Sequence, residues 1–320
     1  MPSAGFSAYL AQQGFILLDG GLATELERRG HDLNDPLWSA KVLLEDPGAI
    51  LAAHLAYLEA GADCVTTATY QATFQGLAAR GIDGARAGEV MRGAVDLAVQ
   101  ARDRFRARST RGGRIRPLVA ASIGPYGAFL ADGSEYRGKY GIGASDLAAF
   151  HRRRLHLLAE SPADVLACET LPSLDEARVL AALAREADEK PAWYSFTCRD
   201  EGHLSDGTPV REVAGWAEGT ACVTAVGVNC TDAALVPDLI GALVAGTRKP
   251  VIVYPNAGGT WDADAKRWGR GEEIPDWGEA CRRWIAAGAV GVGGCCRVGP
   301  DDIRRMRAVL GRLPHRVRKD

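Results

Sequence analysis

The chain alternates between short apolar runs and longer amphipathic segments along most of its length. The apolar runs are rich in β-branched and small residues and are bounded by turn residues, which is typical of buried strands. The segments between them repeat their apolar positions at helical spacing. Eight strand–helix units in a chain of 320 residues predict an α/β fold, a (β/α)8 barrel of the TIM type. The expected strands lie at 15–21, 63–70, 117–127, 163–170, 191–198, 225–230, 250–259 and 291–296.

Two of the amphipathic segments carry clear helix ends. The first has Asp46 as its expected N-cap and Pro47 at the first helical position, and it closes at Gly61. The second starts at Ser173 and carries Glu176 three residues later, which is the pattern of a capping box. The last two helices are expected within 275–289 and 299–313.

A doubly wound sheet is the competing α/β architecture. It would place a glycine-rich phosphate loop directly after the first strand. Gly20 and Gly21 do follow that strand, but no third glycine comes at the required spacing. Because no low-complexity linker divides the chain either, we expect residues 1–320 to form one domain, with a core from about 15 to 312.

Polar or reactive residues repeatedly follow the apolar part of an expected strand. In a (β/α)8 barrel the carboxyl ends of all strands meet on one face, where active sites lie. The pattern therefore predicts one shared site. Its candidate residues are Asp19, Thr69, Tyr70, Cys168, Glu169, Thr170, Asn229, Cys230, Asn256, Cys295 and Cys296.

Three cysteines stand out among the eight in the chain. Cys230 ends the run AVGVNC, and the pair Cys295–Cys296 ends the run GVGGCC. Adjacent side chains of a regular strand point to opposite faces, but Gly293 and Gly294 allow the backbone to turn so that both sulfurs reach one point. Three thiolates can hold Zn²⁺ and leave its fourth position open, as in catalytic zinc sites. The other five cysteines are expected to be structural, although Cys168 adjoins Glu169.

Two carboxylates at strand ends are candidates for substrate contact. Glu169 closes its strand and suits either a general base or an anchor for an ammonium group. Asp19 is followed by Gly20 and Gly21, whose backbone can approach a ligand closely. An ion pair for Glu169 and a helix N-cap for Asp19 are the structural alternatives. None of the six histidines shows metal-ligand spacing.

Two long loops have the character of lids. The segment 122–141 is glycine-rich and carries four aromatic residues, and the segment 199–210 is polar and turn-rich. Aromatic rings could surround a cation, whereas ordinary surface coverage is the alternative. The four aromatic residues are Tyr126, Phe129, Tyr136 and Tyr140.

Charge and composition narrow the class of partners. The formal net charge is −2, which gives no sign of binding to nucleic acid or to an anionic membrane. The start of the chain does not resemble a signal peptide, and no stretch of about 18 apolar residues predicts a membrane span. Cysteines in such a chain are expected to be reduced, so we expect a cytoplasmic protein. The sequence does not predict an oligomeric state.

Most of these segments match one family. The chain resembles the homocysteine S-methyltransferases, and in particular the bacterial subgroup that uses S-methylmethionine. The resemblance covers residues from about 15 to 307, and the combination of GVNC with GGCC is its most specific part. The matching segments are LLDGGLATELERRG, PLWSAKVLLEDP, TTATYQAT, ASIGPYGAFLADGSEYRGKY, LACETLPS, FTCRDEGHLSDGTP, GVNC, VIVYPNAGG and GGCCR.

The resemblance implies a (β/α)8 barrel with Zn²⁺ bound by Cys230, Cys295 and Cys296. It also implies that Asp19 and Glu169 hold the amino acid part of L-homocysteine. Gly20, Thr69, Asn229 and Tyr126 are further candidates for substrate binding. The chain has PNAGG where the family commonly has PNSG, so a role for Asn256 carries over less firmly. No cobalamin or folate module is visible in the sequence.

The expected reaction is methyl transfer from a sulfonium donor to the thiol of L-homocysteine, which forms L-methionine. S-methylmethionine, S-adenosylmethionine and betaine are all onium donors, and the lack of an adenosine-binding glycine loop favours S-methylmethionine. Selenohomocysteine could replace the acceptor. One alternative is a zinc hydrolase or lyase with Glu169 as general base, and another is a non-catalytic protein stabilised by zinc.

Overall fold

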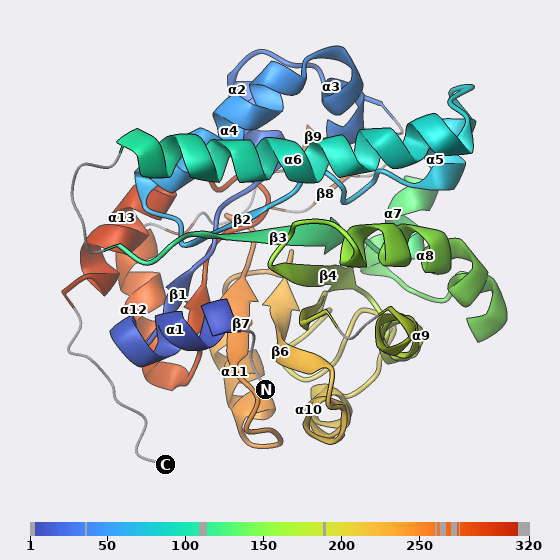
Figure 1. Cartoon of the computed structure of the whole chain (residues 1–320). Coiled ribbons are helices and arrows are strands. Elements are labelled where there is room, and N and C mark those ends of the chain that lie inside the picture. Colours follow the sequence, from blue (N-terminus) through green and yellow to red (C-terminus); the bar gives the residue numbers. More distant parts are fainter. Residues whose placement is uncertain are drawn as a thin grey trace.

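Parallel strands close into a barrel at the centre of the computed structural model (Figure 1). The structure describes residues 4–35, 37–108, 114–187, 190–259, 261–262, 267–269, 274 and 276–312. The sheet order is β1-β10-β7-β6-β5-β4-β3-β2, and a parallel bridge between Leu18 and Cys64 joins the two ends. The predicted (β/α)8 barrel is therefore confirmed, and each predicted strand overlaps an observed one, although β4 and β6 extend beyond the predicted ranges. The eight strands are β1 Ile16–Leu17, β2 Cys64–Thr66, β3 Leu118–Ile123, β4 Val165–Leu171, β5 Ala192–Phe196, β6 Val223–Asn229, β7 Val251–Tyr254 and β10 Gly291–Val292.

Helices surround this barrel, and α6 runs along one whole side of it (Figure 1). A separate antiparallel pair joins β8 Trp261–Asp262 to β9 Arg267–Trp268. Among the described residues, no helix is long and apolar enough to cross a membrane. The helices are α1 Ala4–Gln13, α2 Leu22–Arg28, α3 Ser39–Glu45, α4 Pro47–Ala60, α5 Phe74–Ala78, α6 Gly84–Arg108, α7 Tyr126–Leu130, η1 Ser134–Tyr136, α8 Ala144–Ala159, α9 Leu174–Glu186, α10 Val210–Gly219, α11 Val236–Val244, α12 Trp277–Ala287 and α13 Pro300–Leu310.

The helix ends follow the predicted chemistry with one exception. Asp46 caps α4 by accepting a hydrogen bond from the Ala49 amide at 3.1 Å, and Gly61 ends the helix with a φ of 119°. Ser173 likewise caps α9 through the Glu176 amide. The capping box is wrong, however, because the Glu176 carboxylate does not return to the cap. It is fully buried and accepts hydrogen bonds from the loop that follows β3.

The interior of the barrel is filled by the side chains that alternate inward along the strands. Helix α1 closes the end where the strands begin, with Phe6 and Tyr9 packed into this inner core. The Tyr9 hydroxyl also donates to the Ile115 carbonyl at 3.2 Å, just before β3 starts. The inner core consists of Phe6, Tyr9, Ile16, Leu18, Cys64, Leu118, Ala120, Val165, Ala167, Trp193, Ala225, Ile252 and Tyr254.

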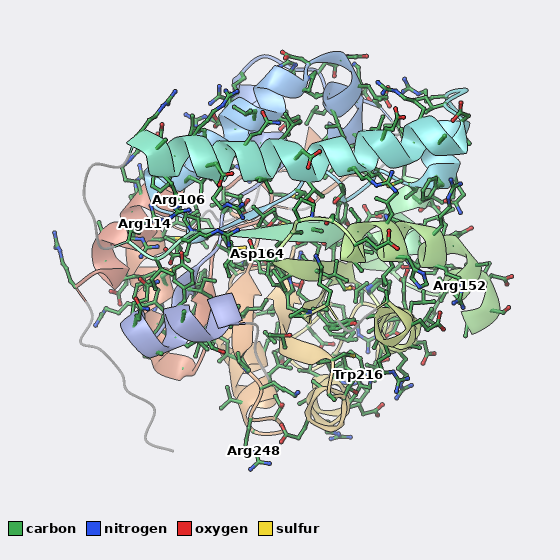
Figure 2. All side chains as sticks on the ribbon, in the orientation of Figure 1. Arg106, Arg114, Arg152, Asp164, Trp216 and Arg248 are labelled. Carbon is green, nitrogen blue, oxygen red and sulfur yellow. The ribbon has the colours of Figure 1, made fainter. Side chains whose placement is uncertain are left out.

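Two buried or half-buried aspartates at this same end are paired with arginines. Asp63 Oδ1 lies 2.5 Å from Arg307 Nη2 and 3.4 Å from Arg114 Nη2. Asp164, which precedes β4, accepts from Arg102 at 3.2 Å and from Arg116 at 2.8 Å. Arg114 and Asp164 can be found in Figure 2 on the side of the barrel where α1 lies. Both aspartates at the end of the barrel that α1 closes are thus neutralised by arginines.

Candidate active site

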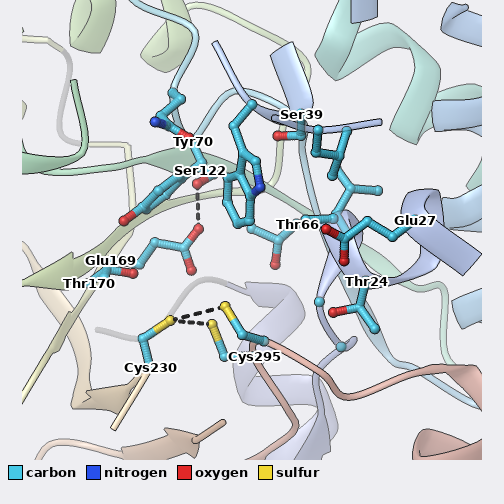
Figure 3. A pocket seen from close by; sticks show the side chains of 18 of the residues that line it. Thr24, Glu27, Ser39, Thr66, Tyr70, Ser122, Glu169, Thr170, Cys230 and Cys295 are labelled. Atoms are coloured by element: carbon cyan, nitrogen blue, oxygen red, sulfur yellow. Dashed lines mark hydrogen bonds between the residues drawn. The ribbon is translucent and has the colours of Figure 1, made fainter. Parts of the chain in front are cut away.

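A cavity of about 290 Å³ lies at the opposite end, where the strands terminate (Figure 3). The predicted strand-end residues Asp19, Glu169, Cys230, Cys295 and Cys296 all line it. The prediction of one shared site at this face therefore agrees with the geometry. Its wall also includes Gly20, Gly21, Thr24, Glu27, Trp38, Ser39, Thr66, Tyr70, Ser122, Glu135, Tyr136, Thr170 and Tyr254.

The three cysteine sulfurs meet at one point of the cavity wall. Cys230 follows β6 in a left-handed conformation, with a φ of 48°. Its sulfur lies 2.7 Å from that of Cys295 and 3.7 Å from that of Cys296. Both distances exceed the ~2.05 Å of a disulfide bond, and all three cysteines are free. The hydrogen bonds that Cys230 accepts from the other two thiols hold its pKa well below the ordinary value.

The backbone after β10 turns so that adjacent cysteines can share this point. The amide of Gly293 still bonds to the Val253 carbonyl of β7, but that of Gly294 bonds to the Asp19 carbonyl, which follows the neighbouring strand β1. A Cβ on Gly294 would lie 2.2 Å from the Val298 side chain, so only glycine fits this turn. The Asn256 side chain then accepts from the Cys296 amide at 3.1 Å and holds the second cysteine in place.

The donor set fits zinc. The three sulfurs lie within 4.8 Å of one another, and no further cysteine, histidine or carboxylate joins the group among the described residues. Tetrahedral coordination with Zn–S bonds of about 2.3 Å places sulfurs about 3.8 Å apart. The Cys230–Cys296 pair already has this spacing, while Cys295 would move away from Cys230 by about 1 Å on binding the metal. Three soft thiolates favour zinc over hard cations such as Mg²⁺ or Ca²⁺.

Two buried carboxylates, Asp19 and Glu169, line the same cavity. Asp19 accepts from the Thr66 amide at 2.7 Å and from the Thr66 hydroxyl at 3.0 Å. Glu169 accepts from the Ser122 hydroxyl and from the Tyr254 hydroxyl, the latter at 3.0 Å (Figure 3 shows the contact with Ser122). Burial raises the pKa of Asp19 to about 8 and that of Glu169 to about 7. Both are therefore poised to gain from a cationic ligand.

No lysine or arginine is among the described residues that line the cavity, and Asp19 and Glu169 form no ion pair in the described part of the chain. The carboxylates of the wall are Asp19, Glu27, Asp32, Asp35, Glu135 and Glu169, and of these Asp35 pairs with Arg80 outside the cavity. An acidic cavity of this kind suits a ligand that carries positive charge.

Three predicted substrate contacts do not reach the cavity. Thr69 is fully buried and donates to the Ser122 carbonyl at 2.7 Å. Asn229 is also buried, and its side-chain amide bonds to the backbone and hydroxyl of Thr170, each at 2.8 Å. Tyr126 packs its ring against Phe150, with centroids 4.9 Å apart. These side chains support the residues that line the wall instead of forming it.

The two predicted lids differ. The loop 122–141 contributes Ser122, Ala131, Gly133, Glu135 and Tyr136 to the cavity wall, whereas the described residues of 199–210 contribute none. Phe129 and Tyr140 stack on Tyr126, at 5.7 and 5.4 Å, away from the cavity. Of the four aromatic residues expected to surround a cation, only Tyr136 has that position.

Several wall residues were not candidates from the sequence, among them Ser122, Tyr254, Thr66, Trp38 and Glu135. Ser122 and Tyr254 continue the inward alternation of Leu118–Ala120 and of Ile252, so strand periodicity could have found them. Thr66, Trp38 and Glu135 lie at a strand end or in loops, where no period applies, and the sequence carries no comparable signal for them.

Comparisons with known proteins agree with this geometry. A family model described as homocysteine S-methyltransferase matches residues 16–310. The chain is 48% identical to homocysteine S-methyltransferase YbgG of Bacillus subtilis, over 92% of this chain and 93% of that protein. It is 47% identical to homocysteine S-methyltransferase of Escherichia coli, over 94% and 97%. Among solved structures, the metallated form of the homocysteine methyltransferase MmuM from E. coli superposes with a TM-score of 0.86 at 44% identity, covering 95% of this chain and 99% of that one.

Proposed function

The chain belongs to the homocysteine S-methyltransferase family, and we propose that it transfers a methyl group from S-methylmethionine to the thiol of L-homocysteine, with zinc held by Cys230, Cys295 and Cys296. Its relatives are enzymes that act on a thiol, and so is this protein. The zinc and the choice of donor are the parts that we add.

One observation carries the proposal: three thiols converge beside two buried carboxylates that lack a cationic partner among the described residues. Zinc with three thiolate ligands supplies an open fourth position that takes a thiol in its deprotonated, nucleophilic form. The neighbouring carboxylates fit the ammonium group that homocysteine carries at its other end. The wall thus offers complementary chemistry to both ends of one small amino acid.

Asp19 and Glu169 act in this proposal as binding groups. Thr66 fixes Asp19 through two hydrogen bonds, and Ser122 and Tyr254 fix the two oxygens of Glu169. Because both oxygens of Glu169 already accept hydrogen bonds, the arrangement supports an ammonium anchor more than a general base. Holding the acceptor at one end sets the direction from which its sulfur meets the methyl group.

The transfer is a displacement at the methyl carbon. The thiolate of homocysteine forms the new S–CH3 bond while the bond from that carbon to the donor sulfur breaks. The electron pair of the broken bond stays on the donor sulfur, which becomes a neutral thioether, so S-methylmethionine and homocysteine give two molecules of methionine. Opposite charges cancel in this step, and their attraction is strongest where water is excluded. Trp38, Tyr70 and Tyr136 line the cavity and would help to exclude it.

The acidic wall supports S-methylmethionine as the donor. This donor carries a sulfonium and an ammonium group, and the cavity offers several carboxylates for them. Betaine brings only one cationic group, where S-methylmethionine brings two. S-adenosylmethionine has the same charges but also needs space for an adenosine group.

The test is methionine formation by reduced, zinc-loaded protein with homocysteine and each of the three donors in parallel. We expect turnover with S-methylmethionine to exceed that with the other donors, to disappear on chelation and to return with zinc. Preference for another donor would overturn the donor assignment, and full activity of metal-free protein would overturn the zinc assignment.

A further inference from the structure

Glu135 lines the cavity, and one of its carboxylate oxygens has no hydrogen-bond partner. It lies on η1 (Ser134–Tyr136) in the loop that follows β3, and its side chain lines the cavity. The residue is partly exposed, but its Oε2 atom is buried and has no hydrogen-bond partner. A buried carboxylate oxygen without a partner is costly, since it has lost water and gained nothing in return. A positively charged ligand in the cavity beside Glu135 would offset this cost.

The surroundings of Glu135 contain sulfur and aromatic rings. Negative charge on Cys230 raises the pKa of Glu135, which reaches about 7 mainly through burial. The next residue, Tyr136, is also near Cys230, because its hydroxyl helps to lower the pKa of that thiol. Burial raises the pKa of Tyr70, and the charges of Glu135 and Cys230 raise it further. The centroid of its ring lies 6.1 Å from that of Trp38. Glu135 thus lies close to the point where the sulfurs converge.

The nearest arginine of the same loop is engaged elsewhere. Arg137 is mostly exposed, and its guanidinium bonds to the Asp132 carbonyl and the Ser134 hydroxyl and pairs with the Asp132 carboxylate at 3.7 Å. No ion pair to Glu135 is formed within the described ranges. Asp19 and Glu169 form a separate pair of carboxylates, and the charge of Glu169 adds to the effect of burial in raising the pKa of Asp19. Besides the pair Asp19 and Glu169, Glu135 is therefore a second acidic position near Cys230, whereas Glu27 acts on Cys296.

We propose that Glu135 pairs with the sulfonium of the methyl donor and so selects donors that are positively charged at sulfur. The inference rests on the proposed function, because it assigns the second acidic position of the same cavity. The methyl group must lie between the acceptor sulfur and the donor sulfur. The donor sulfonium therefore lies near Cys230, in the part of the cavity that Trp38, Tyr70 and Tyr136 line. Aromatic faces stabilise such a cation, and the carboxylate supplies its counter-charge.

The pairing acts on binding and not on the chemical step. The donor sulfur is fully charged when it binds and loses that charge as the methyl group leaves. A carboxylate beside it therefore stabilises the bound donor more than the transition state. Removing the charge by Glu135→Gln should raise the KM for S-methylmethionine about 30-fold, as for the loss of one Coulomb pair in a partly buried site. The kcat should stay the same or rise.

The decisive measurement compares two ligands that differ by one methyl cation. Calorimetric titration with S-methylmethionine and with methionine gives their affinity ratio, and both ligands share the ammonium and carboxylate groups. We expect the wild type to prefer S-methylmethionine and Glu135→Gln to lose most of this preference. The matched control is Asp132→Asn, which removes a charge from the same loop while keeping an acceptor for the Ser134 amide. It should retain the wild-type ratio.

The outcomes separate the two levels of the proposal. A preference that persists in Glu135→Gln overturns the inference, and so does an equal loss of affinity for both ligands, which would place the ammonium group at Glu135. Absence of a preference in the wild type also overturns it. If the wild type prefers S-methylmethionine through Glu135 but makes no methionine from homocysteine, the inference stands and the proposed function fails.

Discussion

The two ends of the barrel treat their carboxylates in opposite ways. At the end closed by α1, Asp63 meets Arg114 and Arg307, and Asp164 meets Arg102 and Arg116. At the cavity end, hydroxyl and amide groups donate hydrogen bonds to Asp19 and Glu169, and one oxygen of Glu135 has no hydrogen-bond partner. No lysine or arginine pairs with these three carboxylates in the part of the chain that the structure describes.

We infer that the carboxylates of the closed end contribute to stability, whereas those of the open end serve function. Paired carboxylates at the closed end tie α13 and the start of β3 to the barrel. Unpaired ones at the open end are unfavourable in the free protein, since burial raises the pKa of each. A bound cation would offset this cost, and this is the role that we propose for the ammonium and sulfonium groups of the substrates.

The largest effect is expected from removing a sulfur at the open end. Cys230→Ser or Cys296→Ser should lower kcat/KM at least about 1,000-fold, equivalent to about 4 kcal/mol, and lower the zinc content together with it. The fold should be kept because neither residue belongs to the inner core. Activity and metal analysis of the purified variants give the result.

Cys281→Ser is the matched control, since this cysteine is buried in α12 away from the three sulfurs. It should keep zinc and kcat. A Cys230 variant that lacks metal but stays active would contradict the assignment of the open end as a thiol-activating site.

The strand-end pattern explains why these cysteines could be found from sequence. Hydrophobic period and turn residues placed all eight strands, and parallel strands bring their ends together wherever they occur in the chain. Cys230, Cys295, Cys296, Asp19 and Glu169 were located by this rule alone. The family resemblance then supplied the chemistry.

The same rule could not say which way each terminal side chain faces. Thr170, next to the end of β4, and Cys230, directly after β6, both have positive φ, so the alternation of side chains stops at these residues. Asn229 then turns to Thr170, and Glu169 keeps the inward position. Glu135 was missed for another reason: it lies in a loop, and its position depends on tertiary contacts such as that of its carbonyl with the Thr197 hydroxyl.

At the closed end, Asp63→Asn should reduce stability instead of activity. The change leaves Arg114 and Arg307 without their shared carboxylate, and breaking a buried pair in this way costs about 3 kcal/mol. Urea unfolding should show the loss, while kcat and both KM values should stay near those of the wild type. Asp301→Asn serves as control because its pairs are exposed, and it should change stability by less than about 1 kcal/mol. A large rise in KM for Asp63→Asn would break the division between the two ends.

At the open end, Glu169→Gln should behave in the reverse manner. We expect the KM for homocysteine to rise about 30-fold, as for the loss of a charged contact worth about 2 kcal/mol, without a loss of stability. The variant also tests pH dependence. A folded-state pKa of about 7, raised above the unfolded value, contributes stability at low pH that is lost as the pH rises toward 7.

Unfolding of substrate-free protein between pH 4 and pH 8 measures this contribution in the range set by the shifted pKa. The free energy of unfolding of the wild type should fall relative to that of Glu169→Gln as the pH rises. Parallel curves for the two proteins would show that the carboxylate is not held in an unfavourable state, and the contrast between the ends would then lose its energetic basis.

Glu176 makes it possible to distinguish the effect of position from the effect of pairing. It lies at the open end, but both of its carboxylate oxygens already have hydrogen-bond partners. Its oxygens accept from the Tyr126 amide at 2.6 Å, from the Tyr140 hydroxyl at 2.9 Å and from His151 Nε2 at 2.8 Å. Arg154 donates to Nδ1 of the same histidine, so His151 is neutral with its proton on Nε2, in line with the lowering of its pKa by burial.

If pairing decides the role, Glu176→Gln should resemble the closed-end variants. It should lower the free energy of unfolding by about 1.5 kcal/mol, since the amide nitrogen cannot accept a hydrogen bond and charge-assisted contacts are lost. The KM for homocysteine should change less than in Glu169→Gln, which urea unfolding and steady-state kinetics on the two variants will compare directly. A shift in acceptor KM equal to that of Glu169→Gln, with stability unchanged, would mean that location at the open end, and not the absence of a partner, marks a carboxylate for binding.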